Sequence, residues 1–80
     1  MLLSDLPTGK CAIVEAVVSS SEKMQTATLQ RLKALGFIGG EPVQILRRGL
    51  GGREPLAVQI GETLFALRLL EAQCIQVRSL

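Results

Sequence analysis

The sequence predicts a small, mainly β domain: a partly open barrel of about five short strands with one inserted α-helix and a short helical turn before the last strand. Two observations lead to this fold class. Short apolar segments rich in β-branched residues alternate with Gly, Pro and Ser turns, and one segment has helical spacing. The 80 residues are 48% hydrophobic but include only two aromatics, both Phe, so the core must be aliphatic. We expect one domain over residues 1–80.

The first elements are a turn and a strand. Leu3 and Leu6 lie in a Pro- and Gly-containing turn, and we expect both to enter the core. Residues 10–18 (KCAIVEAVV) favour a strand that is buried on much of both faces. Its two faces would carry Ala12, Val14, Ala16 and Val18 on one side, and mostly Cys11, Ile13 and Val17 on the other.

A helix is predicted to follow. Ser19 and Glu22 have the spacing of a capping box, and Gly36 stands where a left-handed helix cap is needed. The stripe between them consists of Met24, Thr28, Arg31, Leu32 and Leu35. Phe37 and Ile38 follow the cap, and we expect them to pin the helix onto the barrel. The alternative is that part of this pair stays exposed as a docking patch.

The remaining chain predicts four short strands at 41–48, 56–60, 64–69 and 74–78. Gly61 and Glu62 suit a two-residue type II′ hairpin turn, and residues 70–73 form one helical turn. Val43, Ile45, Ile75 and Val77 are expected to face inward. One strand, one helix and four further strands in this order indicate a barrel of the SH3-like type.

The segment 49–52 (GLGG) is not a phosphate-binding loop, because no Lys-Ser/Thr pair and no helix follow it. Its flanks suggest a contact patch for a partner protein. Arginines at 47, 48 and 53 would supply directional hydrogen bonds, and Leu50 a small apolar anchor. The candidate partner-binding residues are therefore Arg47, Arg48, Leu50 and Arg53, with Phe37 and Ile38 as the second choice. The alternative is a solvated loop with scattered arginines.

The composition disfavours an enzyme. The chain has no histidine, its carboxylates are dispersed, and no serine or cysteine has an evident base partner. We expect no catalytic residue, no cofactor and no tightly bound metal, although weak binding of a divalent ion between two chains stays open. Cys11 and Cys74 are interpreted as small buried thiols.

The net charge of +2 is too small to indicate nucleic acid by itself. A base-stacking surface would also need aromatics on strands, and only Phe65 qualifies. No apolar stretch approaches the roughly 20 residues of a membrane span, and no signal peptide is evident. We therefore expect a cytoplasmic protein.

Three blocks carry a family resemblance: "LSDLPTGKCAIV", "RLKALGFIGGEPVQILRR" and "EPLAVQIGETLFALRLLEAQCIQV". Together they cover nearly the whole chain, and the sequence resembles the bacterial ferrous iron transport protein A (FeoA) family. The resemblance implies an SH3-like barrel with an inserted helix. It also implies a cytosolic accessory of ferrous iron uptake, whose partner is the GTPase part of the ferrous iron transporter B permease.

Such a protein would approach the membrane only through this partner, and homo-oligomers are an open option. Because the same domain occurs at the C-terminus of iron-dependent repressors, the alternative function is a repressor-type or nucleic-acid-binding barrel module.

Overall fold

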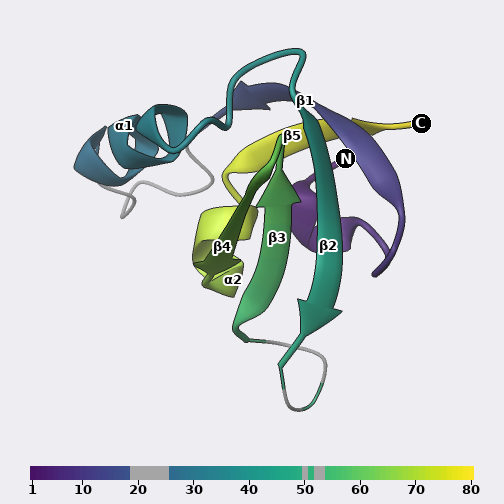
Figure 1. Ribbon diagram of the computed structural model, residues 1–80. Coiled ribbons are helices and arrows are strands. Elements are labelled where there is room, and N and C mark those ends of the chain that lie inside the picture. Colours follow the sequence, from purple (N-terminus) through teal and green to yellow (C-terminus); the bar gives the residue numbers. More distant parts are fainter. Residues whose placement is uncertain (19–25, 50, 52–53) are drawn as a thin grey trace.

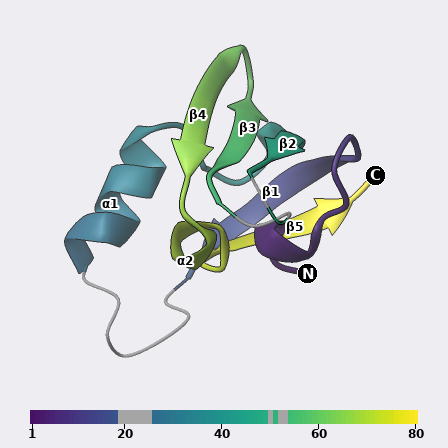
Figure 2. The same cartoon turned by 90° about the horizontal axis from the view of Figure 1, so that it is seen from below.

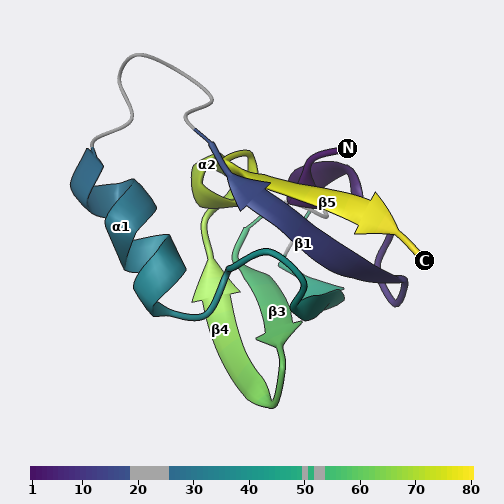
Figure 3. The same ribbon diagram turned by 90° about the horizontal axis from the view of Figure 1, so that it is seen from above.

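The structure is a computed structural model that describes residues 1–18, 26–49, 51 and 54–80. The chain folds, in order, into η1 (Leu3–Asp5), β1 (Cys11–Val17), α1 (Thr26–Ala34), β2 (Pro42–Arg48), β3 (Leu56–Ile60), β4 (Thr63–Leu67), α2 (Leu69–Ala72) and β5 (Ile75–Ser79). The strands form one five-stranded antiparallel sheet with the order β4-β3-β2-β1-β5. The sheet curls so that β1 and β5 lie over β2, β3 and β4 (Figures 1 and 3). The barrel is not closed, which confirms the predicted fold class.

The core forms because each strand sends alternate residues inward. Val43 and Ile45 of β2 and Ile75 and Val77 of β5 are buried, as predicted. Leu56, Val58 and Ile60 of β3 join them, together with Leu3 and Leu6 of the N-terminal turn. The aliphatic core expected from the composition is therefore present.

Strand β1 departs from its predicted pattern. Its pairing with β5 shifts between Val14 and Ala16, which is the mark of a β-bulge. Beyond the bulge Val17 packs against the core, although it was assigned to the opposite face. Cys11 is exposed, so the prediction of a buried thiol was wrong there: Cys11 lies at the start of β1 on the face opposite the buried Ala12 and Val14. Cys74 is buried, as predicted.

Helix α1 ends in the predicted cap. Gly36 has φ +113°, a region that favours glycine. The Phe37 N–H donates to the Leu32 carbonyl at 3.2 Å and the Gly36 N–H to that of Lys33 at 3.1 Å, which is the Schellman pattern. Leu32 and Phe37 are both fully buried, so this turn does pin the helix onto the barrel. The predicted helix start, with Ser19, Glu22 and Met24, lies outside the described residues.

The β3–β4 hairpin turns at Gly61 and Glu62, between the paired residues Ile60 and Thr63. Gly61 has φ +57° and no described non-glycine residue has positive φ, in agreement with the predicted type II′ turn. Strands β2 to β5 and the helical turn α2 lie within two residues of the predicted bounds, the largest difference being that β4 ends at Leu67 and Leu69 already begins α2. Figures 2 and 3 both show α1 beside β4.

One edge of the sheet is covered by the start of the chain. The Val77 N–H of β5 donates to the Met1 carbonyl at 2.8 Å, and the Met1 amino group donates back to the Val77 carbonyl at 3.2 Å. Leu2 and Gln76 form an isolated antiparallel bridge. The N-terminal residues thus continue the ladder beyond β5.

Candidate partner-binding surface

The predicted contact patch begins at the end of β2. Arg47 is exposed there, and Arg47, Arg48, Gly49, Pro55, Ala57 and Ala66 line a shallow depression of about 370 Å³. Arg47 pairs with Ala57 on β3, and Ala57 pairs with Ala66 on β4. Because the side chains of the two alanines are small, these residues form the floor of the depression. Leu50 and Arg53, the other residues of the patch, lie outside the described residues.

Arg48 has a different setting from the one predicted. Its Nη2 donates to the Ser4 carbonyl and to the Leu6 carbonyl, each at 3.0 Å, and the side chain is half-buried. Because these acceptors lie more than 40 positions away in the sequence, the arginine ties β2 to the N-terminal turn. Nη2 therefore has an internal role that the sequence did not predict, and the role of Arg48 at the rim of a partner surface stays a prediction.

Gly49 allows the chain to leave β2. A Cβ atom at this position would come within 2.0 Å of the Glu54 carbonyl oxygen. No side chain fits such a close backbone approach, so the glycine brings the two ends of the loop together. The Glu54 carboxylate then accepts a hydrogen bond from the Leu69 N–H at 2.5 Å, which links the loop to α2.

The second predicted patch is reduced to one residue. Phe37 is fully buried and its ring centroid lies 6.2 Å from that of Phe65, so its side chain offers nothing to a partner. Ile38 is 50% exposed. Phe37 is buried because it forms part of the helix cap, where its side chain contacts the barrel.

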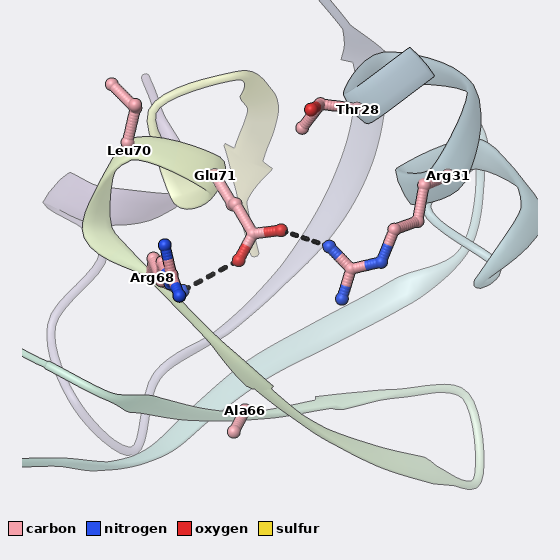
Figure 4. Close-up of a pocket in the computed structure, with 6 residues that line it drawn as sticks. All are labelled: Thr28, Arg31, Ala66, Arg68, Leu70 and Glu71. Atoms are coloured by element: carbon pink, nitrogen blue, oxygen red, sulfur yellow. Dashed lines mark hydrogen bonds and ion pairs between the residues drawn. The ribbon is translucent and has the colours of Figure 1, made fainter.

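Sequence reasoning missed a second depression, of about 390 Å³, between the two α-helices and the end of β4 (Figure 4). Thr28 and Arg31 of α1, Ala66 and Arg68 at the end of β4, and Leu70 and Glu71 of α2 line it. Arg31 Nη1 and Glu71 Oε2 form an ion pair at 2.5 Å. Glu71 Oε1 accepts the Arg68 N–H at 2.9 Å.

One signal for this arrangement was present in the sequence. Arg68 and Glu71 have the N-cap to N3 spacing of a helix start, with the carboxylate reaching back to the cap N–H. The approach of Arg31 was not visible, because it depends on how α1 is placed against α2. The two depressions share Ala66, and two arginines line each of them.

The described residues that line the two depressions include one carboxylate, Glu71, and no cysteine or histidine. Within the described residues, no three side chains among His, Cys, Asp and Glu lie close enough together to hold a metal ion. The surface instead offers guanidinium groups beside apolar floor residues, which suits recognition of carboxylates.

The comparison with family models decides the family. The FeoA domain model matches residues 1–79. The chain belongs to the FeoA family. The FeoA resemblance noted in the sequence is therefore confirmed over almost all of the chain.

Solved FeoA structures share this fold. FeoA of Stenotrophomonas maltophilia, solved with zinc, is 44% identical, with a TM-score of 0.84 over 96% of this chain and 88% of that one. It is described as an SH3-domain protein and a candidate activating factor of bacterial ferrous iron transport. FeoA of Chlorobium tepidum is 32% identical, with a TM-score of 0.84 over 100% of this chain and 70% of that one.

A manganese-dependent transcriptional repressor is 20% identical, with a TM-score of 0.81, and this FeoA chain covers 41% of it. At that identity the likeness shows the fold alone. No match was found among curated proteins.

Proposed function

We propose that this FeoA protein is a small cytoplasmic accessory of bacterial ferrous iron uptake, and that it acts by binding the cytosolic GTPase part of the ferrous iron transporter B permease. Family membership supports the link to iron transport. The related S. maltophilia protein, described as a candidate transport activating factor, supports an accessory role.

The observation that carries the interaction is the arginine-rimmed outer face of the sheet. Arg47 is exposed beside the low floor formed by Ala57 and Ala66. A guanidinium at the rim of such a floor pairs well with carboxylates of a partner, and rim charges mainly set the association rate. Leu50 and Arg53 belong to the same proposed surface by sequence position.

The proposal is of a binding protein and not of an enzyme. Arginines and small or apolar residues line both depressions, Thr28 and one carboxylate, Glu71, line the second, and the chain contains no histidine. In the part of the chain that the structure describes, no helix has the length and apolar character needed to cross a membrane. Contact with the membrane would then come through the permease.

The proposal can be tested by surface plasmon resonance against the purified cytosolic part of the permease. We expect Arg47→Glu to slow association by about three- to ten-fold at low salt, with a smaller effect at high salt. Arg78→Glu is the matched control: it makes the same change of charge at an exposed position of β5. Absence of binding by the parent protein would refute the proposal, and equal effects of both variants would place the contact elsewhere.

A further inference from the structure

The outer edge of β4 carries unused backbone groups. In a two-residue hairpin the residues that flank the turn, here Ile60 and Thr63, exchange both backbone hydrogen bonds, and the pairs alternate from there. The N–H and C=O groups of Leu64 and Ala66 therefore point away from β3. Arg68 continues the same alternation, and its N–H does point outward, where Glu71 Oε1 accepts it.

Strand β4 itself has none of the sequence features that usually protect an edge, although α1 lies on the far side of the groove beside it (Figures 2 and 3). Exposed edges are normally blocked by a lysine, a proline, a bulge or a covering segment. Strand β4 (TLFAL) contains no charge and no proline, and its pairing with β3 runs without a register shift. Leu64 is 63% exposed. Within the described residues no backbone hydrogen bond reaches Leu64 or Ala66 from outside the β3 pairing.

The groove beside this edge is positively charged. Arg31 and Arg68 line it together with a single carboxylate, Glu71, whose two oxygens are already used by Arg31 and by the Arg68 N–H (Figure 4). The Arg31 side chain is 57% exposed. Arg68 is also exposed, and among the described residues it takes part in no ion pair. Leu70, 53% exposed, adds an apolar wall.

We propose that the β4 edge binds an extended, acidic segment of a partner protein by strand addition. The segment's backbone pairs with the outward groups of Leu64 and Ala66. A carboxylate of the segment binds Arg68 or Arg31, and an apolar side chain packs on Leu64 or Leu70. Main-chain hydrogen bonds supply affinity in this mode, and alternate side chains supply specificity.

A second copy of the chain is the less suitable occupant. In a symmetric β4–β4 pairing the arginines of one groove would face those of the other, and like charges oppose such a contact. Residues of both α1 and α2 line the groove, which also favours a single segment over the edge of another folded sheet. The inference requires a protein partner, as the proposed function does, but not that this partner is the permease.

The test uses the full chain, labelled with ¹⁵N, and a short capped peptide in which valine alternates with glutamate. Chemical shift changes are expected at the amides of Leu64 and Ala66. Ala66→Pro removes an outward N–H without touching the β3 ladder, and it should weaken binding by about ten-fold or more. Arg68→Gln should weaken binding by roughly three-fold or more at low salt, with Arg78→Gln as the unchanged control.

A peptide with lysine in place of glutamate should bind at least about ten-fold more weakly. If Ala66→Pro does not fold, Arg68→Gln and the lysine peptide decide the question alone. Shift changes confined to other surfaces, or equal binding of the two peptides, would overturn the proposal. Concentration-dependent shifts of Leu64 and Ala66 without peptide would also overturn it, in favour of a second copy. Because the permease is absent from this experiment, its failure leaves the proposed function to its own test.

Discussion

The two edges of the sheet differ in whether their outward backbone groups have hydrogen-bond partners. At β5 the backbone of Val77 is hydrogen-bonded to Met1, and Leu2 bridges Gln76. At β4 the outward groups of Leu64 and Ala66 meet no backbone partner among the described residues. Both edges belong to one continuous five-stranded sheet.

This difference separates the edge that stabilises the fold from the edge that we propose to bind a partner. The covered edge brings with it a buried turn, because Leu3 and Leu6 are both fully inaccessible to solvent. The bare edge adds little to the core through Leu64 and Ala66, whose side chains are exposed. Substitutions at the covered edge should therefore change the stability of the fold, and those at the bare edge should change binding.

The largest expected effect compares two leucines. Leu3→Ala should lower the free energy of unfolding by about 2–5 kcal/mol, because it leaves a cavity in the core. Leu64→Ala, the same change at a 63% exposed position, should stay within about 0.5 kcal/mol of the parent. Urea denaturation followed by circular dichroism measures both. Similar losses for the two variants would remove the contrast between the edges.

The next effect concerns the arginine that holds the covering turn. Arg48→Gln should cost about 1–2 kcal/mol, because two hydrogen bonds from a cation to the Ser4 and Leu6 carbonyls are lost. The neighbouring Arg47→Gln should change stability by less than about 0.5 kcal/mol. Thermal and urea melts of the pair provide the check. If the two variants melt alike, Arg48 does not secure the turn in solution.

The smallest effect lies beside the bare edge. The Arg31–Glu71 ion pair is open to solvent on the arginine side, and pairs of this kind contribute less than about 1 kcal/mol. A double-mutant cycle with Arg31→Gln and Glu71→Gln isolates the coupling free energy, which should fall further at high salt. A coupling above about 2 kcal/mol would mean that α1 depends on this contact for its position.

The local parts of the fold could be predicted well from the sequence. The cap at Gly36 and the turn at Gly61 depend on a positive φ that glycine adopts easily, and both glycines have it. The inward faces of β2, β3 and β5 follow from simple alternation of apolar residues. Each of these signals involves only residues that are close together in the sequence, so it can be recognised without knowledge of the tertiary structure.

The features that were not predicted correctly depend on contacts between residues that are distant in the sequence. The bulge in β1 shows only in its register with β5, and apolar residues on both faces of β1 hid which face is covered. Arg48 resembles any arginine beside a loop until the carbonyls of Ser4 and Leu6 are placed against it. The Arg31–Glu71 contact likewise depends on the packing of two helices.

The same sheet order has a consequence for folding during synthesis. Strands β2, β3 and β4 follow one another in the chain and pair with their neighbours, so they can assemble as they leave the ribosome. Strand β1 is made first, yet one of its two partners is β5, where Val14 meets Val77. Closing this long loop is slow, because its entropy is lost before the contacts form. We therefore expect the nascent protein to hold an apolar strand that is incompletely paired until β5 emerges, and exposed apolar strands of this kind favour aggregation and chaperone binding.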